Sequence, residues 1–327
     1  MKQRRGGFDV TNTVNITDPR TVHDAVVAII SARYPQAPVN ALDTAFETFG
    51  HLYAGTLPGY LGCDTWYHDA QHSLDCALAM ARLMDGHDAD EIAQRRLGPT
   101  RTVLGVILAL FHDAGYIRRE ADADVRNGAE FTLYHVGRSA EFLQDFLPRA
   151  GFAKQADLAA QLVHFTGYEI ALDQIQVRGQ IDRKLGYLLG TADLIAQLAD
   201  RSYLEKCRSH LYREFELCGL AGKPRRKGPK PIYSSPDDLI RQTPKFVGQL
   251  FDERLDGYFG AVYRHAESHF SGHNPYLDEI QHHLQHVRRL IRAKDFAQLR
   301  RRPRRIHAPV LRRKLGLGKA IMNTASR

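Results

Sequence analysis

The chain has 327 residues, of which 43% are hydrophobic, which is enough to bury one large core. Its formal charge of +8 is uneven, because the segment from His286 onward carries 14 Lys and Arg residues against one acid while the rest is net acidic. The longest apolar run, Val103 to Phe111, is far shorter than the roughly 20 residues that span a bilayer, which argues against a membrane protein.

The cysteines and the N-terminus indicate a cytoplasmic protein. The four cysteines form no C-x-x-C pair and fit reduced thiols (Cys63, Cys76, Cys207 and Cys218). The first residues run directly into polar sequence without the apolar stretch of a signal peptide.

Helical periodicity dominates, and no alternating pattern flanked by hairpin turns occurs. Helices are expected at residues 21–33, 41–53, 66–84 (stopped by Gly86), 99–113, 131–147, 154–164, within 181–217 and 236–270, and at 275–293. The pattern predicts an all-α fold with an N-terminal tail at 1–20, a helical domain at 21–292 and a basic tail at 293–327. Removal of residues 296–327 is expected to leave the core folded.

The dipeptide His112-Asp113 follows an almost entirely apolar helix, so it is expected to be buried. A buried carboxylate needs a cation or a hydrogen-bond donor. The pair is therefore either a set of metal ligands or a hydrogen-bonded His–Asp pair.

His68 and His72 are four residues apart and share one face of the expected helix at 66–84. The same spacing occurs in the polar C-terminal third, where the histidines are interpreted as surface residues (His265/His269 and His282/His286). His68 and His72 differ because they lie one helix upstream of the buried His-Asp pair.

Asp193 lies between apolar residues near a helix start, as a metal ligand or a first-turn acid, with Asp200 as the weaker alternative. His135 and His164 are each flanked by apolar residues, and such isolated histidines are usually core residues. However, all these side chains lie near the ends of separate helices, the arrangement from which helical bundles build metal sites.

This order, His72, His112-Asp113, Asp193, resembles the signature of the HD-domain metal-dependent phosphohydrolases, over roughly residues 67–203. The segment from Tyr67 to His72 is similar to the entry motif of cyclic nucleotide phosphodiesterases. The additional His135 and His164 resemble ligands of dinuclear HD-GYP phosphodiesterases and of HD-type di-iron oxygenases. The resemblance implies an HD-type helical bundle with its metal-site core at residues 66–205.

The resemblance also implies roles for these residues. Two divalent ions (Mn, Fe, Mg, Zn or Ni) would be held by His72, His112, Asp113, His135, His164 and Asp193, with Asp113 as the bridge. A hydroxide held between the ions would hydrolyse a small phosphorylated substrate, most simply a nucleotide phosphodiester or phosphomonoester. His68 would donate the proton to the leaving group, and Arg138 is either a phosphate contact or a surface residue.

The chain matches neither phosphodiesterase subgroup fully. Asp69 stands where cyclic nucleotide enzymes have Asn, and the sequence after His112-Asp113 is Ala-Gly-Tyr, with no later Gly-Tyr-Pro. The same sequence features are also compatible with two alternatives. One is a di-iron oxygenase with the same ligands, and the other is a non-catalytic scaffold whose basic tail, with a second basic run between Lys223 and Lys230, binds an anionic partner.

Overall fold

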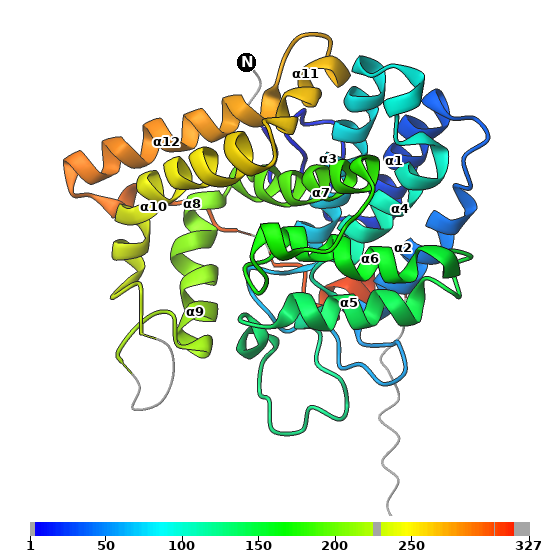
Figure 1. The fold of residues 1–327 in the computed structure, drawn as a ribbon. Coiled ribbons are helices and arrows are strands. Elements are labelled where there is room, and N and C mark those ends of the chain that lie inside the picture. Colours follow the sequence, from blue (N-terminus) through cyan, green and yellow to red (C-terminus); the bar gives the residue numbers. More distant parts are fainter. Residues whose placement is uncertain (1–3, 225–229, 304, 317–327) are drawn as a thin grey trace, which may run out of the picture.

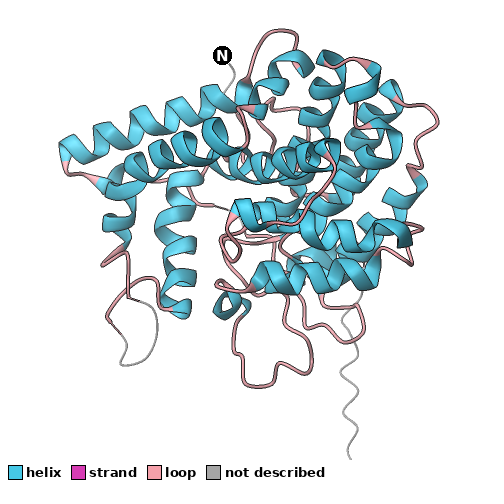
Figure 2. Cartoon of the chain, in the orientation of Figure 1, coloured by secondary structure: helices cyan, strands magenta, loops and turns pink. Residues whose placement is uncertain are grey.

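The computed structural model describes residues 4–224, 230–303 and 305–316, and it is all-α as expected (Figures 1 and 2). The helices are α1 (Pro19–Arg33), α2 (Asn40–Ala54), α3 (Ala70–Asp90), α4 (Gly98–Phe111), α5 (His135–Phe146), α6 (Ala156–Leu162), α7 (Gln180–Leu198), α8 (Tyr203–Lys206), α9 (Tyr212–Cys218), α10 (Pro236–Leu250), α11 (His265–His269), α12 (Pro275–Ala293) and α13 (Ala308–Lys314). Two segments are π-helical: Cys207–Leu211 lies between α8 and α9, and Phe251–Tyr258 follows α10. Strand pairing in the described ranges is limited to three isolated bridges. None of the described helices is both long and apolar enough to cross a bilayer.

The centre of the fold is α3, which packs against α1, α4, α7 and α11. Figure 1 shows α3 and α7 running through the middle, with α1, α2 and α4 to one side and α10 and α12 to the other. Nearly every residue of α3 is buried, including polar ones, because neighbouring helices surround it. This arrangement places the first turn of α3 inside the molecule.

The bounds of α3 differ from the expected helix at both ends. It begins after Asp69, whose carboxylate accepts hydrogen bonds from the backbone N–H groups of Gln71 and His72, as a helix cap does. It continues through Gly86 to Asp90, so the expected stop at Gly86 was wrong. The glycine is required for packing instead, since a Cβ there would lie 1.7 Å from the carbonyl oxygen of His265.

Gly86→Ala is therefore expected to destabilise the protein by about 3 kcal/mol or more, because the obstructing atom belongs to the backbone of a packed helix. Chemical unfolding of the two proteins measures the difference. Gly248→Ala is the matched control, because Gly248 lies in α10 with open space around it. Alanine there should stabilise by up to about 1 kcal/mol. Equal effects at both positions would contradict the packing role of Gly86.

The segments expected to be tails pack against the helical body as far as they are described. Near the N-terminus, Asp9 is fully buried and forms a 2.6 Å ion pair with Arg82 of α3. Near the C-terminus, the N–H of Ile306 donates to the Asp69 carboxylate at 2.7 Å, and Leu311 is fully buried. Sparse apolar residues and hydrogen bonds thus anchor the described parts of both segments to the helical body, and the expected bounds at 1–20, 21–292 and 293–327 stay a prediction. Residues 317–327 lie outside the described ranges.

Leu311→Ala should consequently destabilise the protein by about 2–5 kcal/mol, the usual cost of removing a buried leucine side chain. The exposed neighbour Arg313 provides the control, since Arg313→Ala removes a charge from the same helix without opening a cavity. Thermal and urea unfolding of both variants compare the two effects. If Leu311→Ala were as stable as wild type, the C-terminal segment would not be part of the folded unit.

Candidate metal centre

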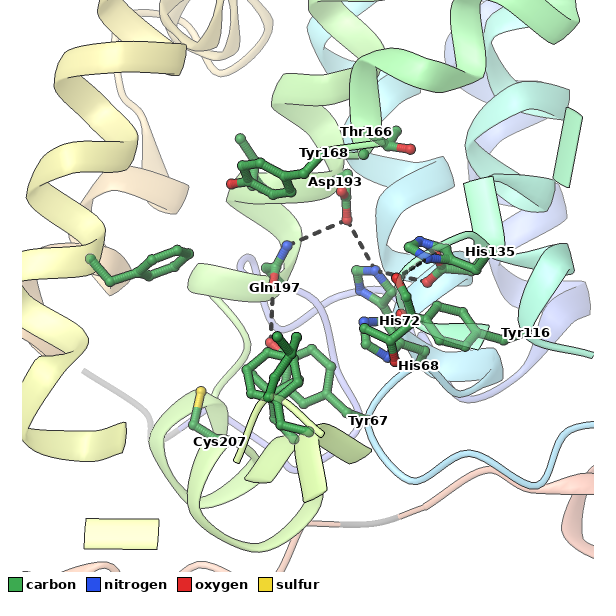
Figure 3. Close-up of a pocket in the computed structure, with 18 of the residues that line it drawn as sticks. Tyr67, His68, His72, Tyr116, His135, Thr166, Tyr168, Asp193, Gln197 and Cys207 are labelled. Carbon is green, nitrogen blue, oxygen red and sulfur yellow. Dashed lines mark hydrogen bonds and ion pairs between the residues drawn. The ribbon is translucent and has the colours of Figure 1, made fainter. Parts of the chain in front are cut away.

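Four of the predicted ligands converge in the interior from three helices, and Figure 3 shows two of them, His72 and Asp193. His72 lies in the first turn of α3, and the adjacent pair His112 and Asp113 follows the C-terminal end of α4. Asp193 lies in the C-terminal half of α7. All four are at most 7% exposed, so any charge on them must be compensated from within the protein.

The Nε2 atoms of the two histidines lie within 3.5 Å of each other and of one oxygen of each carboxylate. The Nε2 atoms of His72 and His112 are 3.3 Å apart. Asp113 Oδ2 lies 3.5 Å from His72 Nε2 and 3.3 Å from His112 Nε2. Asp193 Oδ1 lies 3.1 Å and 3.5 Å from the same two nitrogens. His72, His112 and Asp113 in particular can each offer an atom to one shared metal ion.

The orientation of His112 is set by its other ring nitrogen. Nδ1 lies 2.8 Å from the carbonyl oxygen of Ala109 and can bond to it only as a donor. In the neutral ring, Nε2 then carries a lone pair directed at His72 and the two carboxylates. A backbone carbonyl that fixes the tautomer in this way is a common support of histidine metal ligands.

His135 approaches the opposite oxygen of Asp113. It is the first residue of α5, its Nδ1 donates to the carbonyl of Thr132, and its Nε2 lies 3.6 Å from Asp113 Oδ1. Burial lowers the pKa of His135 to about 4, which favours the neutral ring that a metal ligand requires. Asp113 thus presents Oδ2 to one pair of imidazoles and Oδ1 to a third.

Whether a cation would fit among these residues can be judged from Asp113 Oδ2. This oxygen is buried and has no hydrogen-bond partner in the described structure. Burial would raise the pKa of Asp113, but the facing His112 holds it below its ordinary value. Burial would likewise lower the pKa of His112, but Asp113 raises it well above the usual range. The site therefore favours a carboxylate beside a positive charge. A divalent ion among the imidazole and carboxylate atoms would satisfy the same requirement.

His68 lies beside this cluster and is held by Glu214, a residue that the sequence did not suggest. Its Nδ1 is 2.5 Å from Glu214 Oε2, while Oε1 accepts hydrogen bonds from the N–H groups of Trp66 and Tyr67 at 2.6 Å each. Burial would lower the pKa of His68, but the charge and hydrogen bond of Glu214 raise it above its ordinary value. Glu214 is 146 residues away along the chain and lies in α9, in a run without a recognisable motif.

The Tyr116 ring stacks on the rings of two histidines, His68 and His135. The centroids of the stacked rings are 4.3 Å apart for His68 and 4.2 Å apart for His135. The stack places His68 next to the cluster without direct bonding to Asp113. This position suits a proton carrier better than a metal ligand.

The remaining candidates lie elsewhere. His164 is half-buried in the turn Val163–Thr166, its Nδ1 lacks a hydrogen-bond partner, and no hydrogen bond or ion pair between described residues joins it to the cluster. Asp200 instead forms a 2.7 Å ion pair with Lys206. The Arg138 guanidinium donates to the Gly115 carbonyl at 2.9 Å and to Asp122 at 2.7 Å. Arg138 therefore supports the backbone beside the site, and the structure does not bring it to the cavity.

A cavity of about 420 Å³ opens onto the cluster. His68, His72, Asp113, His135 and Asp193 line one end. Along its floor the Tyr67 hydroxyl donates to Gln197 Oε1 at 3.1 Å, which turns the Gln197 amide toward Asp193 (Figure 3). The volume is in the range of small-molecule sites.

Fold and site together define an all-helical protein with a buried His/Asp cluster that could hold metal. The chain belongs to the Npun_R2479-like family, which it matches over residues 23–253. Among curated proteins none matches the chain.

Proposed function

We propose that the protein is a metal-dependent phosphohydrolase that cleaves a phosphoester in this cavity, with an HD-type arrangement of ligands. The observation that carries the proposal is Asp113, a buried carboxylate with one unpartnered oxygen among imidazole nitrogens. His72, His112 and Asp193 would hold one divalent ion, and His135 a second one, with Asp113 between them. The more distant His164 remains a candidate for the second ion.

Divalent ions in such a site supply Lewis acidity, which neutralises phosphoryl charge and lowers the pKa of water. The chain itself supplies orientation and a proton. Ala109 and Thr132 fix the rings of His112 and His135 through backbone carbonyls. The Gln197 amide, turned by Tyr67, can donate a hydrogen bond at the floor of the cavity.

His68 is the proton donor in this proposal. Glu214 occupies Nδ1 and favours the protonated ring, which leaves the Nε2–H as the proton available to a leaving oxygen at the cavity wall. Because Glu214 is bonded to two backbone N–H groups as well, the position of His68 is set before substrate binds.

A di-iron oxygenase is a second candidate, and one observation favours it. Among the described residues, none of those lining the cavity is a lysine or an arginine. An enzyme that oxidises an uncharged substrate needs no such cation. Oxygen uptake and a visible absorption band from the iron-loaded protein, without phosphoester hydrolysis, would favour this alternative.

The scaffold alternative, with an anion-binding basic tail, has weaker support. The Arg312 side chain donates to the Ala54 and Gly55 carbonyls, and Lys314 donates to Thr17. These cations are used within the fold. Arg225, Arg226 and Lys227 of the second basic run lie outside the described residues.

Replacing the bridging carboxylate should remove more metal than replacing any one histidine. Asp113→Ala is expected to lose both ions, whereas His135→Ala should lose only the one on its side, and both should lose phosphoester hydrolysis. Metal content after reconstitution with Mn²⁺ and gel filtration measures this. His282→Ala is the control for surface binding, because His282 is exposed and outside the cluster. Full metal content in Asp113→Ala would refute the dinuclear site.

His68→Ala should lower the rate about 10²- to 10⁴-fold on an alkyl ester, whose leaving group needs a proton. The loss should be small on an activated p-nitrophenyl ester, and the metal content should be unchanged. Glu214→Gln should move the alkaline limit of activity on the alkyl ester to lower pH, because its negative charge raises the pKa of His68. Equal losses on both esters, or loss of metal, would exclude His68 as the proton donor.

A further inference from the structure

The two ends of the cavity differ in chemistry. The cluster end contains imidazoles and carboxylates, whereas the other end is walled by Leu211, Phe215, Leu220, Ile232, Leu239 and Phe246. We call this second end the apolar arm. It belongs to residues 203–246, outside the helices that carry the metal ligands, and includes the π-helical turn Cys207–Leu211. Such turns occur frequently at functional sites, where they redirect side chains.

The charges around the cavity do not suit a polyanion. Besides Asp113 and Asp193 it is lined by Glu169, and no lysine or arginine of the described chain lines it. The nearby Arg254 stacks on the Tyr168 ring at 4.0 Å and donates to the Gly167 carbonyl, so it is engaged within the wall. Two metal ions could balance a single phosphate beside these carboxylates. Further phosphates in the apolar arm would be buried without partners.

The mouth of the cavity is also apolar. Seven large hydrophobic residues are exposed on the described surface, and four of them line this cavity, namely Leu133, Tyr168, Ile232 and Phe246. Isolated exposed hydrophobic residues are ordinary, but a group of them at the entrance of one cavity indicates a binding function. An apolar group of a bound ligand would cover these four side chains and remove them from water.

We infer that the substrate is amphipathic, with one phosphoester group at the cluster and an extended apolar group along the apolar arm. This inference rests on the proposed phosphohydrolase function and specifies the substrate class. The apolar group leaves water as it enters the arm. Among the described lining residues, only those at the cluster end can hold metal ions. The single phosphate therefore lies at that end, where the ions would compensate its charge.

The test uses alkyl p-nitrophenyl phosphodiesters of increasing chain length with the Mn²⁺-loaded full chain. Burial of each methylene should raise kcat/KM about fourfold until the arm is filled. Phe246→Asn should flatten this dependence. Both Phe246 and the control Ile92 are exposed, but Ile92 lies outside the cavity, so Ile92→Asn should leave the dependence unchanged. A naphthyl ester tests whether the arm also accepts a flat ring.

The outcomes separate the inference from the proposed function. Hydrolysis that is independent of chain length, or fastest for a nucleoside triphosphate, would overturn the inference and leave the phosphohydrolase proposal standing. If no ester were hydrolysed with metal bound, the proposed function would fail. Calorimetric binding of the alkyl phosphates would then still test the arm, since affinity should increase with chain length in wild type and not in Phe246→Asn. Flat affinity in wild type would overturn the inference.

Discussion

The fold is organised around one electrostatic requirement, the buried Asp113 carboxylate whose Oδ2 has no hydrogen-bond donor. A carboxylate in an apolar interior is costly unless a positive charge or donors lie beside it. Here the surrounding groups are imidazoles whose outer nitrogens are held by backbone carbonyls, so that their inner nitrogens face the carboxylate. This arrangement is of little use for packing alone, and it gives a physical reason for a cation at the centre.

The same region is tied to parts of the chain that are distant in sequence. One oxygen of Asp69 caps the helix that carries His72, and the other accepts the N–H of Ile306 from the C-terminal segment. Glu214 of α9 connects the backbone before that helix to His68. The position of the first turn of α3 therefore depends on both the C-terminal segment and α9.

Local sequence predicted most helices and the four central residues His72, His112, Asp113 and Asp193, because each is marked by its neighbours, an apolar helix or an i, i+4 pair. It could not predict Glu214, since its role arises from contact with a segment 146 residues away. It also misjudged Gly86, which local rules assign to a helix end but which serves close packing against His265. The sequence did not indicate that the basic terminal segment packs on the helical body, because only a few buried side chains, such as Leu311, anchor it.

The cavity combines a polar end and an apolar arm that come from different parts of the chain. The clustered metal-binding candidates lie on α3, α5 and α7 and directly after α4, whereas the apolar arm is formed by residues 203–246. Glu214 belongs to this second part, yet it holds His68 at the polar end. The helix that shapes the apolar arm thus also positions the proposed proton donor. The hydrogen bonds of the Glu214 carboxylate, to His68 and to the backbone of Trp66 and Tyr67, therefore join the wall of the apolar arm to the polar end.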